Sequence, residues 1–335
     1  MEPNTIPKLL RRMAEKNPQI PAQYLKQDDG TYIPRSFEQL REEVDAFAAG
    51  LASIGVGRKD HVGLVSENRP EWLVADLGIQ CLGAADVPRG NDSMAEELAF
   101  ILGFSECETV VVENAAQLRK VAGVRDEIRT LKQFVVLERS ITEDEAKALA
   151  SEVRRVKVHR YDDLVSDGQA RLAKNPAMIA EEIEQGDSED LATIIFTSGT
   201  TGEPKGVMLT QHNFIFEIGC IPERIDVTPG DIWLCVLPVW HSFERIIQYV
   251  ALGSASALAY SKPIGAIMLQ DLAVVRPQWM ASVPRIWEAV RAGIYRNVKQ
   301  QGGVKLALFS FFVAVGGAHM RLSNLLRGLV PEFRR

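Results

Sequence analysis

The spacing of apolar residues near the N-terminus predicts a long helix. Apolar side chains recur at helical spacing from Phe37 to Leu51. Ser36 and Gln39 form a capping box ahead of this run, and Gly55 ends it. We therefore expect one continuous helix between these two signals.

Short apolar segments and helical segments then alternate along the chain. Strands are expected at 62–65, 109–112, 134–137, 192–196 and 233–237. Helices are expected at 71–82, 94–102 and 117–128 and after Pro284. Such alternation is typical of parallel sheets covered by helices. We expect an α/β fold with doubly wound, mostly parallel sheets and flanking helices, divided approximately into subdomain stretches 60–190 and 191–335.

Two segments depart from this alternation. Residues 139–188 are charged and irregular, and we expect the acidic runs Thr142–Glu145 and Asp187–Asp190 to be solvated faces or connectors. The apolar tract 306–315 is shorter than the roughly 18 residues that span a bilayer. A core helix is the favoured interpretation of this tract. The alternative is an amphipathic helix that makes peripheral contact with the inner membrane surface.

The composition indicates a globular protein with a reduced interior. Of its 335 residues 46% are hydrophobic, enough to build a large core. The net charge of −6 provides no general basic surface, so we expect no nucleic-acid partner. Since the cysteines lack C-x-x-C spacing, we expect reduced core residues rather than disulfides or metal ligands at Cys81, Cys107, Cys220 and Cys235. Because no signal sequence is recognisable, we expect a cytoplasmic protein.

A strand that ends in a turn rich in glycine and hydroxyl groups carries the strongest chemical signal. The turn reads Thr197-Ser198-Gly199-Thr200-Thr201-Gly202-Glu203-Pro204-Lys205-Gly206. Glycines let backbone N–H groups approach an anion, hydroxyls add donors, and the lysine adds a mobile positive charge. Because Lys205 is followed by Gly206, the Walker A spacing is absent. The turn therefore predicts a different kind of triphosphate site, at the sheet edge where ligands of open α/β folds bind.

Three motifs follow one another in the order found in one enzyme family. The turn resembles the signature loop of AMP-forming, adenylate-forming enzymes, which include acyl-CoA synthetases, luciferases and peptide-synthetase adenylation domains. The segment Leu237–Arg245 is similar to Leu-Pro-x-x-His-x-Phe-Glu-Arg of bacterial long-chain fatty acyl-CoA synthetases, and Ser282–Glu288 resembles the element that follows it. The stretch 36–63 also resembles that family. We favour the N-terminal part of a long-chain fatty acid–CoA ligase.

The resemblance implies an ATP-dependent reaction in two steps. A carboxylate attacks the α-phosphate of ATP to give an acyl-adenylate and pyrophosphate, and the thiol of coenzyme A then displaces AMP. A fatty acid, ATP, Mg²⁺ and coenzyme A are the implied substrates and cofactors. His241 is expected to line the place where carboxylate and α-phosphate meet, and no metal ligand is assigned. The β- and γ-phosphates are expected to bind Thr197, Ser198, Gly199, Thr200, Thr201, Gly202 and Lys205.

Other charged and turn residues near these motifs are expected to be structural. Glu244 and Arg245 are adjacent opposite charges, and we expect them to pair structurally rather than act in catalysis. Arg285 is interpreted in the same way. The segment Thr228–Asp231 predicts a turn rather than a ribose-binding element. The segment Asp86–Asp92 departs from the family pattern because it places charges beside a stretch that is commonly buried, which weakens the inference on substrate preference.

The resemblance covers only part of a full synthetase. We find no aromatic-Gly-x-Thr-Glu segment, and the lysine that serves adenylation would lie beyond residue 335. We therefore expect 1–335 to be a partial N-terminal adenylation (AMP-binding) domain without the small C-terminal domain, inactive alone and inclined to self-association. The alternatives are adenylation of another carboxylate, such as a medium-chain, aryl or amino acid, and a non-catalytic module that binds a nucleotide or a partner.

Overall fold

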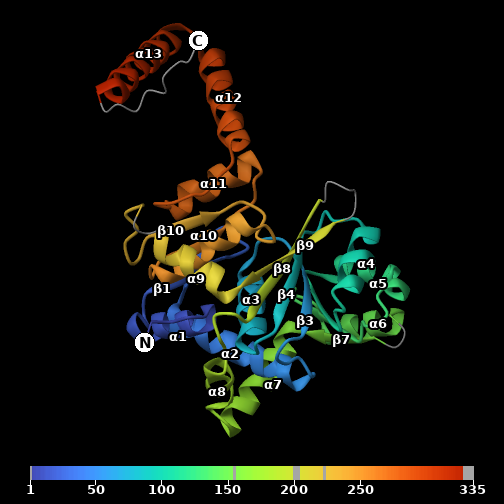
Figure 1. Ribbon diagram of the computed structural model, residues 1–335. Coiled ribbons are helices and arrows are strands. Elements are labelled where there is room, and N and C mark those ends of the chain that lie inside the picture. Colours follow the sequence, from blue (N-terminus) through green and yellow to red (C-terminus); the bar gives the residue numbers. More distant parts are fainter. Residues whose placement is uncertain (1, 154–155, 199–203, 222–223, 327–335) are drawn as a thin grey trace. The chain divides into compact units, whose positions relative to one another are not determined.

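The computed structural model describes residues 2–153, 156–198, 204–221 and 224–326. These residues divide into two units, Met1–Ala281 and Ser282–Arg335. The first unit contains two β-sheets and their helices, and the second contains two helices (Figure 1). Each unit is described by itself.

The larger sheet of the first unit has a doubly wound topology. Its strand order is β7-β6-β5-β3-β4-β8-β9, and neighbouring strands are parallel except β9, which runs antiparallel to β8. The strands are β3 (His61–Val65), β4 (Ala85–Arg89), β5 (Thr109–Val112), β6 (Gln133–Val136), β7 (Lys157–Arg160), β8 (Leu191–Thr197) and β9 (Lys205–Thr210). Because the chain winds outward from β3 in both directions, the expected mostly parallel α/β architecture is confirmed.

Alternate residues of these strands face helices on opposite sides of the sheet. Val62 and Val135 belong to a core cluster with residues of α2 and α3, whereas Val110 and Phe134 belong to a cluster with residues of α4 and α5. These helices are α2 (Phe37–Ser53), α3 (Pro70–Cys81), α4 (Ala95–Phe104) and α5 (Ala115–Gly123). The predicted capping box is present at the start of α2, which confirms the helix expected from the sequence.

Residues 139–188 are largely helical, so the expectation of an irregular stretch is wrong, although the acidic run 142–145 is exposed as expected. They contain α6 (Glu143–Glu152), β7, α7 (Tyr161–Lys174) and α8 (Met178–Glu184). Helix α7 packs closely on α2, where a Cβ added at Gly168 would lie 1.8 Å from the backbone oxygen of Ala46. Only glycine permits this approach. The boundary expected near residue 190 falls between α8 and β8, and strands from both sides of it share the larger sheet.

A smaller sheet joins the start of the chain to residues far along it. Its order is β10-β11-β1-β2, with β10, β11 and β1 parallel and β2 antiparallel to β1. The strands are β1 (Pro21–Lys26), β2 (Tyr32–Ser36), β10 (Ile232–Cys235) and β11 (Ala257–Tyr260). The turn expected at Thr228–Asp231 precedes β10, and Gly230 has a φ of +90° there.

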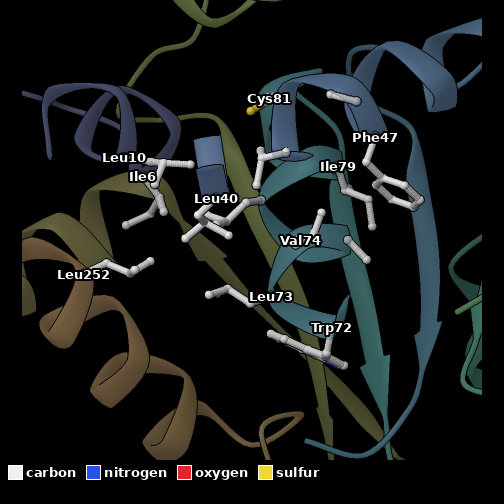
Figure 2. Packing of buried hydrophobic residues seen from close by; sticks show 14 of the residues in the cluster. Ile6, Leu10, Leu40, Phe47, Trp72, Leu73, Val74, Ile79, Cys81 and Leu252 are labelled. Atoms are coloured by element: carbon white, nitrogen blue, oxygen red, sulfur yellow. The ribbon is translucent and has the colours of Figure 1, made fainter. Parts of the chain in front are cut away.

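One apolar cluster ties the helices of the first unit together. Figure 2 shows Ile6 and Leu10 of α1 (Ile6–Lys16) beside Leu40 of α2 and residues of α3. Leu252 of α10 (Ser242–Gly253) belongs to the same cluster. Helix α10 is therefore anchored on the side of the larger sheet that carries α2 and α3.

The described cysteines differ from the sequence expectation at one position. Three of them are buried, but Cys220, at the end of α9 (Gln211–Cys220), is exposed. Burial raises the pKa of the Cys81 and Cys235 thiols well above its usual range. Those two therefore behave as the small apolar core residues that the sequence predicts, whereas Cys220 does not.

The second unit consists of α12 (Pro284–Gln301) and α13 (Gly303–Leu326). The apolar tract 306–315 lies inside α13, whose 24 residues are long and apolar enough to cross a membrane by length and composition alone. None of the residues of α12 or α13 is buried. The expectation of a core helix for this tract is therefore wrong for the chain as the structure describes it.

Candidate active site

The glycine-rich turn connects two paired strands. Strand β8 ends at Thr197 and pairs with β9, so that Thr197 lies opposite Lys205. Both residues and Ser198 are exposed. The predicted phosphate-binding residues Gly199, Thr200, Thr201 and Gly202 lie outside the described residues. The two residues that flank the predicted phosphate-binding turn, Thr197 and Lys205, therefore lie side by side and exposed at the ends of β8 and β9.

His241 caps the N-terminus of α10. It has extended backbone angles, and its Nδ1 accepts a hydrogen bond from the backbone N–H of Phe243 at 3.3 Å. A neutral ring that accepts at Nδ1 carries its proton on Nε2. The side chain is exposed, so Nε2–H can donate to a ligand. The helix N-terminus beside it favours negative charge through the unpaired N–H groups of the first turn.

A cavity of about 700 Å³ brings Thr197 and His241 together. Its wall comes from β8, β9, α9 and the first turn of α10, and it is mostly apolar. The lining residues are Ile195, Thr197, Val207, Leu209, His212, Asn213, Phe214, Phe216, Glu217, His241, Ser242, Phe243 and Ile246. The sequence singled out two of them, and the α9 residues carry no motif that could have identified them. A mostly apolar wall that includes the polar side chains of Thr197 and His241 is typical of a small-molecule site.

Arg245 is the buried centre of a polar network that the sequence did not predict. Its Nη1 donates to Asp86 Oδ2 at 3.0 Å and to Thr193 Oγ1 at 2.8 Å. Its Nη2 donates to carboxylate oxygens of both Asp76 and Asp86, and its Nε donates to the Tyr249 hydroxyl at 2.9 Å. The expected pairing of Glu244 with Arg245 is therefore wrong, because the arginine points into the protein and two distant aspartates neutralise it.

The Arg245 network fixes both parts of the candidate site. Arg245 lies one helical turn after His241 in α10, and Thr193 lies four residues before Thr197 in β8. A single fully buried guanidinium therefore fixes α10 against β8. Burial raises the pKa of Asp76 above its usual range, an effect that Arg245 opposes and Asp86 strengthens.

Glu244 is a buried carboxyl group in the first turn of α10, three residues after His241. Its side chain is 1% exposed, and neither carboxylate oxygen makes a hydrogen bond of full geometry to a described residue. Burial raises the pKa of Glu244 to about 7, although Cys235, Gln248 and Asn68 lie close enough to lower it in part. Its carboxyl group is therefore partly protonated at neutral pH.

The charges of the Asp86–Asp92 segment are accommodated by specific partners. Asp86 binds Arg245, and Arg89 donates from Nη1 to the backbone oxygen of Phe196 at 3.1 Å. The Arg89 guanidinium also lies 5.4 Å from the centre of the Trp240 ring, next to His241. Arg89, one of the charges that depart from the family pattern, thus connects β4 to the end of β8 and to the residue before His241.

The comparison with a family profile decides which family this site belongs to. The profile described as AMP-binding enzyme matches residues 10–330. The chain belongs to the AMP-binding enzyme family. This AMP-binding enzyme is similar to a chloroplastic long-chain-fatty-acid–[acyl-carrier-protein] ligase of Arabidopsis thaliana, with 30% identity over 297 residues that cover 88% of this chain and 40% of that protein. It is 24% identical to long chain acyl-CoA synthetase 3 of the same plant, over 90% of this chain and 45% of that protein.

Solved structures share the fold of this AMP-binding enzyme. The A domain of a carboxylic acid reductase from Segniliparus rugosus, in complex with AMP and a co-purified carboxylic acid, matches with a TM-score of 0.73 and 20% identity over 90% of this chain and 51% of that one. A putative long-chain-fatty-acid CoA ligase from Rhodopseudomonas palustris matches with a TM-score of 0.66 and 20% identity over 89% and 66%. The chain spans about 40–45% of the length of the two plant relatives.

Acidic groups at the site are few in the part of the chain that the structure describes. Glu217 is the one carboxylate that lines the cavity there. No group of three or more His, Cys, Asp or Glu side chains among the described residues is arranged to hold a metal ion. The hydroxyls and the lysine at the ends of the turn suit phosphate oxygens, but no Mg²⁺ ligand can be named from these residues.

Proposed function

We propose that the protein containing this chain activates a long-chain fatty acid with ATP, forming an acyl-adenylate and then a thioester. The cavity shared by Thr197 and His241 is the observation that carries this proposal. Its apolar wall suits a hydrocarbon chain, and Thr197 in that wall is also the first residue of the predicted phosphate cradle. Two relatives whose names include long-chain fatty acids or acyl-CoA support the same substrate class.

The glycine-rich turn and the His241 segment have separate roles in this proposal. The Thr197 and Ser198 hydroxyls and the Lys205 ammonium bind the β- and γ-phosphates of ATP, together with Gly199, Thr200, Thr201 and Gly202 of the turn. His241 Nε2–H and the N-terminus of α10 orient the carboxylate and stabilise negative charge as its oxygen bonds to the α-phosphorus and pyrophosphate leaves. ATP, Mg²⁺ and coenzyme A are the proposed co-substrates and cofactor, and the cytoplasm is the proposed location.

An acyl carrier protein is a second candidate for the thiol that accepts the acyl group. The relative at 30% identity is named as a ligase for that carrier, whereas the 24% relative is named as an acyl-CoA synthetase. Both acceptors end in a thiol that attacks the same acyl-adenylate. Supplying the full-length gene product with each acceptor in turn, and comparing thioester yields, distinguishes them.

The test of the proposed function separates the two half-reactions in the full-length gene product. Lys205→Ala removes one positive charge from the phosphate site and should slow adenylation by roughly ten- to a hundred-fold, since a charge-assisted hydrogen bond contributes about 1.5–3 kcal/mol. Thioester formation from pre-made acyl-adenylate should change much less, because no triphosphate is bound in that step. Radiolabelled pyrophosphate exchange and thioester assays measure the two rates.

A matched control uses an exposed lysine outside the site. Lys147→Ala on α6 removes the same charge and should leave both half-reactions unchanged. Equal losses in both steps with Lys205→Ala, or no loss in either, would refute the assigned role of the turn. Residues 1–335 alone should form neither acyl-adenylate nor thioester, and turnover by this chain would contradict the expectation that further residues are needed.

A further inference from the structure

The charge of the chain is divided unevenly between its two units. Residues 282–335 contain nine Lys and Arg and two Glu, a formal charge of +7. Residues 1–281 contain 29 Lys and Arg and 42 Asp and Glu, a formal charge of −13. An asymmetry of this size points to an anionic partner for the second unit and repulsion of that partner by the first.

Helix α12 places three of its four basic residues opposite its apolar face, and the fourth, Arg291, lies at the border of that face. At about 100° per residue, Arg285, Arg296 and Lys299 lie on one side of the helix. Ile286 and Ile294 lie on the other side, with Val290 and Trp287. Trp287 is 51% and Ile294 48% exposed, whereas Ile286 and Val290 are half-buried, so this apolar face is only partly covered among the described residues. A basic face opposite an apolar face with tryptophan is typical of helices that lie in a membrane interface.

Helix α13 adds a long apolar surface to the same unit. Its 24 residues extend about 36 Å, and the hydrocarbon core of a bilayer is about 30 Å thick. Phe311 and Phe312 are 61% and 64% exposed, and none of the most apolar window is buried within the described structure. Among the described residues, α13 is therefore not a buried core helix.

We propose that the α12–α13 unit binds the surface of an anionic phospholipid bilayer. Helix α12 lies in the interface with its basic face toward the lipid phosphates, and α13 inserts its apolar side chains among the acyl chains. The attraction of each basic residue for an anionic surface adds to the apolar insertion. The acidic first unit is kept away from the same surface by repulsion. The proposal does not depend on which acid or thiol the enzyme uses.

Vesicle flotation tests this proposal with the 335-residue chain and with the full-length gene product. Both should float with vesicles of phosphatidylcholine and phosphatidylglycerol, and binding should fall at high salt and on pure phosphatidylcholine. The combined variant Arg285→Gln, Arg296→Gln, Lys299→Gln should bind roughly a hundredfold more weakly, at about fivefold for each charge. Phe311→Ser with Phe312→Ser should weaken binding at every salt concentration.

A control variant removes the same number of charges from the first unit. Lys132→Gln, Lys147→Gln and Lys174→Gln replace exposed lysines there and should leave vesicle binding unchanged, with circular dichroism checking the fold of every variant. Equal binding to neutral and anionic vesicles would overturn the proposal. So would flotation of the 335-residue chain without the full-length product, which means that further polypeptide covers α13. Dimers that form through α13 and do not bind vesicles would assign this surface to a second copy instead.

Discussion

Replacing Glu244 by glutamine tests whether this carboxyl group is held in an unfavourable environment. Its pKa rises from 4.5 to about 7 in the folded protein, so the folded state keeps the proton over a pH range in which the unfolded chain releases it. The stability that this proton provides is present below pH 4.5 and is lost as the pH rises through 7. A difference of about 2.5 pH units at about 1.36 kcal/mol each gives a loss of about 3 kcal/mol.

Glutamine keeps the shape of the side chain but cannot ionise. The free energy of unfolding of Glu244→Gln, minus that of the wild-type chain, should therefore increase by about 3 kcal/mol between about pH 4.5 and pH 8. Other titrating groups are common to both proteins and cancel in this difference. Urea unfolding followed by tryptophan fluorescence at several pH values measures it.

A surface variant supplies the control for this measurement. Glu184→Gln changes an exposed carboxylate on α8, and its stability difference from wild type should stay nearly constant over the same pH range. If the Glu244→Gln difference is also constant, the carboxyl group is ionised in the folded protein and the reasoning from burial is refuted. A difference that decreases with rising pH would mean that unseen donors stabilise the carboxylate.

Three further predictions concern buried charge, packing and cysteine exposure. Arg245→Met leaves two buried aspartates unpaired and should lower the free energy of unfolding by about 3–5 kcal/mol. Changing both aspartates to asparagine in this variant should recover part of the lost stability, and an unchanged urea midpoint for Arg245→Met would contradict the prediction. Gly168→Ala, which places a Cβ against backbone, should cost about 3 kcal/mol or more, whereas Gly123→Ala, with nothing within 4 Å, should be neutral or stabilising in thermal unfolding. Maleimide should modify Cys220 alone in the native chain and four cysteines in urea, as mass spectrometry can count.

Local signals made much of the fold predictable. The signals that predict a helix start or a strand lie within a few residues of each other. The structure contains the capping box at Ser36 and Gln39, and the apolar strand β3, where the sequence indicates them. Helix α6 has a similar box, formed by Thr142 and Glu145. The run of acidic residues beside this box is equally typical of a solvated connector, so the box alone does not predict the helix.

Long-range contacts explain what the sequence could not predict. Asp86 and Asp76 lie 159 and 169 positions from Arg245, and no pattern near the arginine indicates them. The glycine in α7 lowers helical propensity locally, and its reason appears only when α2 packs against it. For the candidate site, Thr197 and His241 were named from motifs and line one cavity, but their chemical roles remain predictions.

The pairing of β1 with β11 has a consequence for how the chain is made. Gln23 lies opposite Leu258, so the smaller sheet cannot form until more than two hundred further residues have left the ribosome. At about 5–20 residues per second this takes roughly ten to fifty seconds. During that time the β1–β2 hairpin has an unpaired edge, and a two-stranded hairpin is barely stable alone. The nascent protein therefore exposes this unpaired strand edge to other chains throughout that interval, before its own later residues can cover it.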